Sequence, residues 1–94
     1  MFSVTFKDKN TVALSGRLDA SQTDAARLQF DKITESAVMD FKNLEYISSA
    51  GLGVLFATQK RLKSAGHGLK LINLNSHIRD VFRYARFELI FEIE

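Results

Sequence analysis

The chain has 94 residues, enough for one domain, and its 46% hydrophobic and 26% charged residues indicate a folded globular protein. Thirteen basic and 11 acidic side chains leave a net charge of +2, too small to favour direct nucleic-acid binding. Without cysteine, an apolar leader or an apolar run of about 20 residues, we expect a cytoplasmic protein with no disulfide, no zinc–thiolate site and no membrane contact.

The first elements along the chain form a predicted hairpin. Apolar and polar residues alternate over residues 2–7 and again over 11–18, which is typical of strands with one buried face. The polar stretch 7–10 between them predicts the turn.

A helix is predicted next, at about residues 21–35. Asp19 and Ser21 both have side chains that cap helix N-termini, and Asp24 would complete a capping box if Ser21 is the cap. The apolar side of this helix is expected to contain Ala25, Leu28 and Ile33.

The central part of the chain predicts a strand, a loop and a second helix. Residues 37–41 are apolar and rich in strand formers, so we expect a strand buried on both faces and central in a sheet. Residues 42–45 read as a loop, and a helix begins near Ser49 and runs to about Ala65. Gly66 is available to end this helix in a left-handed conformation.

The last elements are a strand at 69–74, a helix at 76–85 capped by Ser76, and a short strand at 87–94. The order is therefore β-β-α-β-α-β-α-β over residues 1–94. It predicts an α/β domain with a single mixed sheet and helices packed against it.

Residues that carry catalytic or metal chemistry are scarce. His67 and His77 have no second histidine or carboxylate at metal-ligand spacing, and no glycine-rich phosphate loop is present. The basic cluster of Lys60, Arg61 and Lys63 is expected to be a solvated helix face. We therefore expect no enzyme activity, no metal and no cofactor.

The segment Ser48-Ser49-Ala50-Gly51-Leu52-Gly53 is the most informative part of the sequence, since it joins a buried strand to a helix. In parallel sheets such loops are where ligands and partners meet the fold. Ser49 would lie at or next to the helix cap. Two glycines in the first turns are costly, so we interpret Gly51 and Gly53 as a bare surface that another protein approaches.

These residues resemble a known family. Residues 40–55, DFKNLEYISSAGLGVL, resemble the signature of STAS domains, and within them that of bacterial anti-sigma-factor antagonists. The stretch 15–20, SGRLDA, is similar to the turn before the family's first helix, and 76–82, SHIRDVF, to its third helix. The resemblance covers essentially the whole chain.

The resemblance implies a switch rather than an enzyme. The unphosphorylated antagonist binds an anti-sigma factor that is also a GHKL-type serine kinase, and a sigma factor is released. The kinase then phosphorylates one serine, which corresponds to Ser49 here, and a PP2C-type phosphatase reverses the reaction. Ser48 stands where the family often has Asp, which makes it a second candidate acceptor. The implied partner surface contains Asp19, Ser21, Ser48, Ser49, Ala50, Gly51 and Gly53.

A phosphate on Ser49 would need hydrogen-bond donors. The backbone amides of Gly51 and Leu52 are candidate donors to a phosphate on Ser49.

The same fold would also suit a STAS subunit of a lipid-transport ABC complex or of a signalling scaffold. A third reading is a small enzyme or nucleotide-binding domain. We expect a monomer or a weak dimer, for which Phe2, Phe6, Phe87 and Phe91 offer apolar material.

Overall fold

The computed structural model describes all of residues 1–94 and has one five-stranded sheet in the order β1-β2-β3-β4-β5. The first two strands are antiparallel, and each later strand is parallel to its neighbour. The strands are β1 (Phe2–Asp8), β2 (Thr11–Leu18), β3 (Ala37–Ile47), β4 (Leu69–Ile72) and β5 (Glu92–Ile93). The helical elements are η1 (Ala20–Gln22), α1 (Thr23–Phe30), α2 (Ser49–Ser64), α3 (Ser76–Tyr84) and η2 (Phe87–Leu89). The predicted single mixed sheet with helices against it is confirmed.

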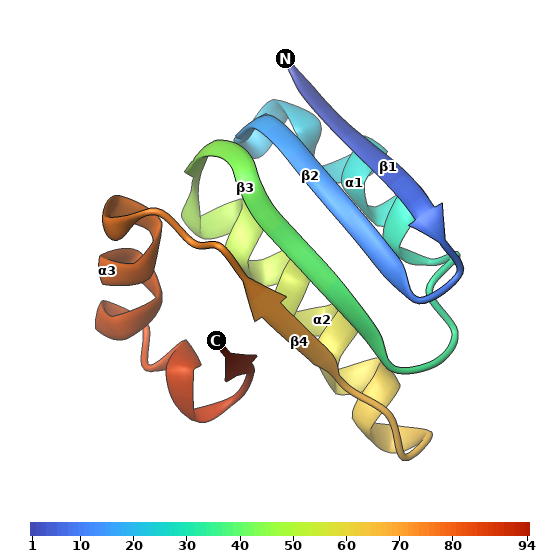
Figure 1. Cartoon of the computed structure of the whole chain (residues 1–94). Coiled ribbons are helices and arrows are strands. Elements are labelled where there is room, and N and C mark those ends of the chain that lie inside the picture. The colour runs from blue at the N-terminus through green and yellow to red at the C-terminus, as the bar shows by residue number, and fades with distance from the viewer.

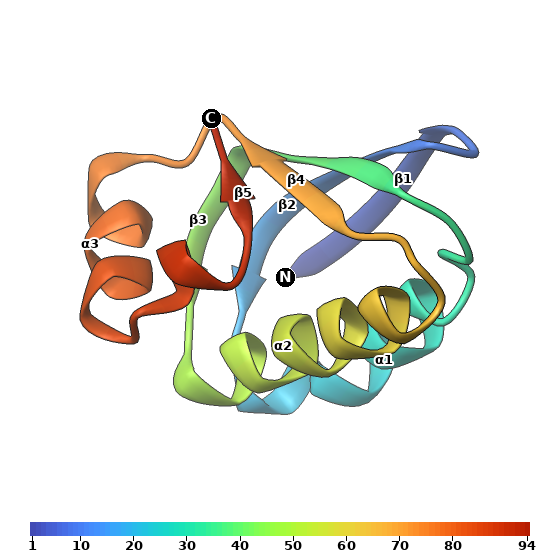
Figure 2. The same cartoon turned by 90° about the horizontal axis from the view of Figure 1, so that it is seen from below.

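The helices cover the sheet unequally (Figure 1). Seen from below, α1 and α2 form one layer under the strands, while α3 lies to one side near the end of β3 (Figure 2). The side chains that alternate toward this layer are buried, among them Val12 and Leu14 of β2 and Met39 and Phe41 of β3. The period-2 pattern that predicted β2 therefore marks the face that packs on the helices.

β3 is longer than the sequence predicts. It is central, as expected, but it continues through residues 42–45, which read as a loop, as far as Ile47. Its pairing with β2 shifts register twice, between Ala13 and Ser15 and between Gly16 and Arg17. These irregularities space the buried residues of β3 three apart, at 41, 44 and 47, and so hide the alternation. The prediction that this strand is buried on both faces is also wrong, because Val38 and Asp40 are only half-buried on the uncovered face.

The first helix is shorter and rotated relative to its prediction at 21–35. Asp19 caps η1 rather than Ser21 capping one long helix, and α1 ends at Phe30. Beyond Phe30, the amides of Lys32 and Ile33 bond three residues back, to Gln29 and Phe30, so the chain tightens and leaves the helix. The buried residues of α1 are Ala26 and Phe30, while Ala25 and Leu28 are exposed.

α2 buries the apolar side chains of Leu52, Val54, Leu55 and Leu62. Phe56 is 39% exposed, whereas Gln59 is buried and bonds to the Leu69 amide (2.8 Å) and the Ile90 carbonyl (2.8 Å). Gln59 thus ties α2 to β4 and to the C-terminal segment. The predicted end of the helix is confirmed, because Gly66 has φ +82°. The predicted basic face at 60–63 is exposed, and Arg61 also donates to the Phe30 carbonyl.

The C-terminal third differs in three details from the prediction. β4 stops at Ile72, and Asn75 rather than Ser76 caps α3, through a 2.8 Å bond from the Ile78 amide. The predicted strand at 87–94 is instead η2 followed by the two-residue β5. It turns helically because the amide of Phe91 bonds to the carbonyl of Phe87, which brings both rings against Phe82.

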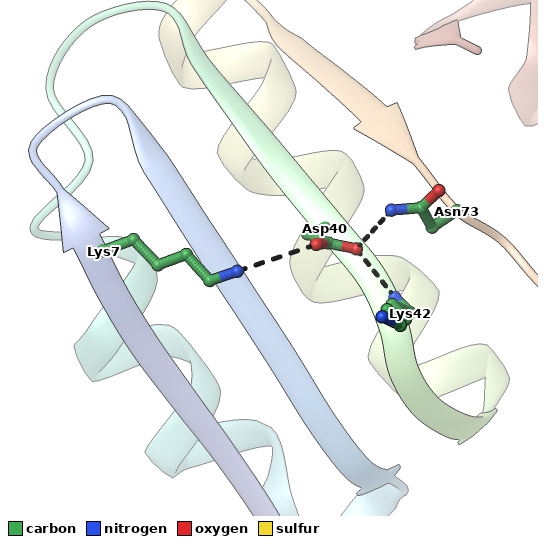
Figure 3. A network of polar contacts seen from close by, with 4 residues as sticks. All are labelled: Lys7, Asp40, Lys42 and Asn73. Carbon is green, nitrogen blue, oxygen red and sulfur yellow. Dashed lines mark hydrogen bonds and ion pairs between the residues drawn. The ribbon is translucent and has the colours of Figure 1, made fainter.

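The uncovered face of the sheet is held by an ionic cluster (Figure 3). Asp40 accepts hydrogen bonds from the Asn73 amide group (3.0 Å) and the Lys42 backbone amide (2.9 Å), with the Lys7 ammonium 4.0 Å away. Burial acts to raise the pKa of Asp40, but these bonds and charges outweigh it and keep the pKa below its ordinary value. The cluster joins β1, β3 and the residue after β4.

Candidate functional site

The candidate site lies where β2 and β3 end side by side. The parallel register pairs Leu18 with Ile47, so the residues that follow them, Asp19 and Ser48, leave the sheet at the same edge. The amide of Ser48 bonds to the carbonyl of Leu18 at 2.9 Å and fastens the two chain segments together. η1 and α2 therefore begin next to each other, at the carboxyl ends of parallel strands.

Ser48 is the N-cap of α2. Its backbone is extended, and its hydroxyl accepts a hydrogen bond from the Gly51 amide at 3.2 Å. Its carbonyl accepts the first bond of the helix, from the Leu52 amide at 2.9 Å. Ser48 is half-buried, and its hydroxyl and carbonyl are both bonded to the start of the helix.

Ser49 is the first residue of α2, next to the cap as expected, and it is exposed. Its hydroxyl makes no hydrogen bond within the chain, in contrast to that of Ser48. The prediction that Gly51 and Leu52 offer free amides is wrong, because both amides are already bonded to Ser48. The first two helical amides, those of Ser49 and Ala50, have no carbonyl one turn earlier in α2 to bond.

The two glycines of this segment have different environments. Gly51 is buried, and a Cβ there would lie 2.8 Å from both Cγ and the carbonyl oxygen of Leu18. The interpretation of Gly51 as bare outer surface is therefore wrong. Its lack of a side chain instead lets α2 start against the end of β2. Gly53 is exposed, and a Cβ there would meet nothing within 4 Å. The packing of the chain gives no reason for a glycine at position 53.

The neighbouring loop presents a carboxylate. Asp19 accepts hydrogen bonds from the hydroxyl (2.6 Å) and the amide (3.0 Å) of Ser21. The bond from the Ser21 hydroxyl, with help from the Ser21 amide and the charge of Arg17, keeps the pKa of Asp19 below its ordinary value. This edge of the sheet therefore carries a fixed negative charge at neutral pH, beside an exposed Ser21 and an exposed Ala20.

Sequence reasoning missed one contact beside the site. The guanidinium of Arg17 lies 4.4 Å from the centroid of the Tyr46 ring, a cation–π arrangement between β2 and β3. Both residues directly precede the paired Leu18 and Ile47. The contact depends on the shifted register of these strands, so no local pattern in the sequence indicates it.

Residues with catalytic chemistry come together at one other place. Ser36 Oγ lies 3.4 Å from His67 Nδ1 in a cleft of about 430 Å³, and it also accepts from the Gly68 amide. No carboxylate bonds to His67, so a nucleophile–base–acid arrangement is not formed. His77 is exposed in the first turn of α3. No group of three or more His, Asp or Glu side chains is positioned to hold a metal. No helix has the length and apolar character to cross a membrane.

Comparison with known proteins places these features in a family. A family model described as "Mlab, STAS domain" matches residues 2–92. BtrV of Bordetella bronchiseptica, which carries an assignment as an anti-sigma factor antagonist, is 40% identical over 65 residues, 69% of this chain and 56% of BtrV. The anti-sigma F factor antagonist of Paenibacillus polymyxa is 33% identical over 69 residues, 68% of this chain and 59% of that protein. The chain thus spans less than two thirds of either relative.

Solved structures share the fold. An anti-sigma factor antagonist from Mycobacterium paratuberculosis superposes with a TM-score of 0.83 at 20% identity, covering 99% of this chain and 83% of that one. Phosphorylated SpoIIAA, a Bacillus cell fate determinant, gives a TM-score of 0.72 at 18% identity, with coverage of 100% and 91%. Because the STAS domain model matches nearly all residues and solved structures share the fold, the chain belongs to the STAS domain family.

Proposed function

We propose that this protein is an anti-sigma-factor antagonist that is switched by phosphorylation of Ser49. Its unphosphorylated form would bind, in the cytoplasm, an anti-sigma factor that is also a GHKL-type serine kinase, and so free a sigma factor or other target. The kinase would phosphorylate Ser49 and a PP2C-type phosphatase would reset it. The observation that carries the proposal is the exposed, unbonded hydroxyl of Ser49, beside a Ser48 hydroxyl that caps the helix.

The position of Ser49 allows a phosphate without unfolding the domain. Phosphorylation adds about −1.5 to −2 charge and three acceptor oxygens. At the first residue of α2 the helix dipole favours this charge, and the amides of Ser49 and Ala50 are the unpaired donors. A phosphate on Ser48 would instead displace the Gly51 amide from the cap. This difference supports Ser49 over Ser48 as the acceptor.

The phosphate would act on the interface with the partner. It would join the carboxylate of Asp19 at the same edge of the sheet, so the local surface would become strongly negative. A partner surface fitted to a small neutral hydroxyl would then meet repulsion or uncompensated desolvation. The proposed contact residues are Asp19, Ser21, Ser48, Ser49, Ala50 and Gly53, while Gly51 acts from inside by holding α2 against Leu18.

The proposal is tested with three versions of the chain as bait in lysate of the native host, namely wild type, Ser49→Ala and Ser49→Asp. Wild type and Ser49→Ala should retain the same GHKL-type kinase, identified by mass spectrometry, and Ser49→Asp should lose it. With the purified kinase, full phosphorylation of Ser49 should weaken binding by about three decades, or about 4 kcal/mol. Equal retention by all three baits would contradict the switch.

A second candidate is a STAS subunit of a lipid-transport ABC complex or of a signalling scaffold. This candidate is supported by the family model, because its description names the STAS domain and does not mention sigma factors. In that case the three baits should all retain the same partner, and a membrane ABC ATPase should be among the proteins identified.

A further inference from the structure

β1 is an edge strand of the sheet and pairs with β2 alone. In Figure 1 no strand lies along its outer side. The amide of Arg17 bonds to the carbonyl of Met1 at 2.8 Å, which sets the phase of the antiparallel ladder. In that phase Ser3 and Thr5 exchange hydrogen bonds with their partners in β2. The amides and carbonyls of Phe2, Val4 and Phe6 therefore point outward from the sheet.

Nothing protects the middle of this edge. Sheet edges are usually blunted by proline, by charged side chains or by a bulge. The chain has no proline, and the one irregularity of β1 falls between Phe6 and Asp8, at its end. The charged residues are also at that end, and Lys7 lies toward the Asp40 cluster on the uncovered face. The stretch from Phe2 to Phe6 is thus an open row of hydrogen-bonding groups.

We propose that this edge is a self-association surface: β1 pairs antiparallel with β1 of a second copy, about a two-fold axis through Val4. This inference does not depend on the proposed switch. In this register Val4 faces Val4 and Phe2 faces Phe6 as hydrogen-bonded pairs, and Ser3 faces Thr5 between them. Apolar residues oppose apolar ones and hydroxyls oppose hydroxyls. A shift of two residues toward the turn would place Asp8 opposite Phe2, so the sequence disfavours that register relative to the one centred on Val4.

The neighbouring helix supports a second copy as the occupant. A groove of about 340 Å³ lies between β1 and α1, lined by Phe2, Val4, Ala25 and Leu28 among others. Leu28 is 70% exposed beside it. Pairing about the axis would bring the two grooves together on the helix side of the joined sheet, where each Leu28 gains apolar neighbours. A short strand and one leucine bury less than a standard interface, so the dimer is weak and forms only at high concentration.

The alternation of amides along β1 gives a specific test. In a dilution series of the labelled chain followed by NMR over a roughly 50-fold concentration range, the amides of Val4 and Phe6 should shift and become protected from exchange as concentration rises. The amides of Ser3 and Thr5 should be protected throughout, because they bond to β2. Sedimentation should show a monomer–dimer equilibrium over the same range. Concentration-independent Val4 and Phe6 signals would overturn the proposal.

Two variants are designed to weaken the β1 self-association surface, and two others serve as controls. Val4→Pro removes the outward amide on the axis but no bond to β2, and persisting protection of Thr5 shows that the hairpin has formed. Leu28→Asp places one negative charge from each copy near the axis and leaves the sequence of β1 unchanged. Each should weaken dimerisation at least tenfold, whereas Leu89→Asp on η2, 76% exposed in wild type, and Ser49→Asp should not. Dimers that survive both Val4→Pro and Leu28→Asp would assign association to another surface and overturn the proposal.

Discussion

The inner and outer faces of the first two turns of α2 use the same residue types for different purposes. On the inner side, Ser48 caps the helix and Gly51 lets it start against Leu18. On the outer side, Ser49 has an unbonded hydroxyl and Gly53 has open space around it. The fold explains the inner serine and glycine completely and the outer pair not at all. Outer residues that cost stability without a structural reason are therefore the ones that point to a partner.

The largest expected effect is on the inner face. Gly51→Ala would place a methyl group 2.8 Å from the Leu18 carbonyl oxygen and 2.9 Å from Ile47 Cγ1, and neither the backbone nor the buried Ile47 moves easily. We expect the free energy of unfolding to fall by about 2–3 kcal/mol, as for overpacked cores. Urea denaturation followed by circular dichroism measures this change. A loss below about 0.5 kcal/mol would show that α2 can shift away from β2.

The two serines should differ by a smaller amount. Ser48→Ala removes the acceptor of the Gly51 amide and should lower the free energy of unfolding by about 1 kcal/mol. Ser49→Ala removes an exposed hydroxyl without a partner and should change it by less than about 0.5 kcal/mol. The same denaturation measurement compares them. If Ser49→Ala is the costlier change, Ser49 is the cap and the case for Ser49 as the phosphate acceptor fails.

The sequence was sufficient for the order of elements because local signals mark most of them: apolar and polar residues alternate in β1 and β2, and a run of strand formers opens β3. It failed where pairing between strands decides the structure. Residues 42–45 look like a loop because Lys42, Asn43 and Glu45 are polar, yet they extend β3 along β2. The spacing of buried residues there comes from register shifts, which only the partner strand defines. Likewise Phe91 reaches the aromatic cluster from a helical turn and not from the predicted strand.

The candidate site was only half predictable for a similar reason. A serine at a strand-to-helix junction is visible in the sequence, and so is the likeness of residues 40–55 to STAS domains. Which serine caps and which glycine is buried depend on how close α2 lies to Leu18, a residue 30 positions or more away in the chain. Local patterns contain no information about that approach. The outer role of Gly53 became distinguishable from the inner role of Gly51 only with the contacts of each.

The smallest effect is also the sharpest test of the comparison. Gly53→Ala adds a methyl group that meets nothing in the chain, so the gain in helix propensity should raise the free energy of unfolding by about 0.5–1 kcal/mol. Under the proposed function the same methyl group should weaken binding of the anti-sigma factor, since it stands on the exposed side of α2 one turn from Ser49. Calorimetry of binding beside urea denaturation separates the two effects, with Ala57→Ser, an exposed position one turn further along α2, as control. A variant that is more stable and binds as tightly as wild type would mean that no partner approaches Gly53, and the partner surface would then end at the first turn of α2.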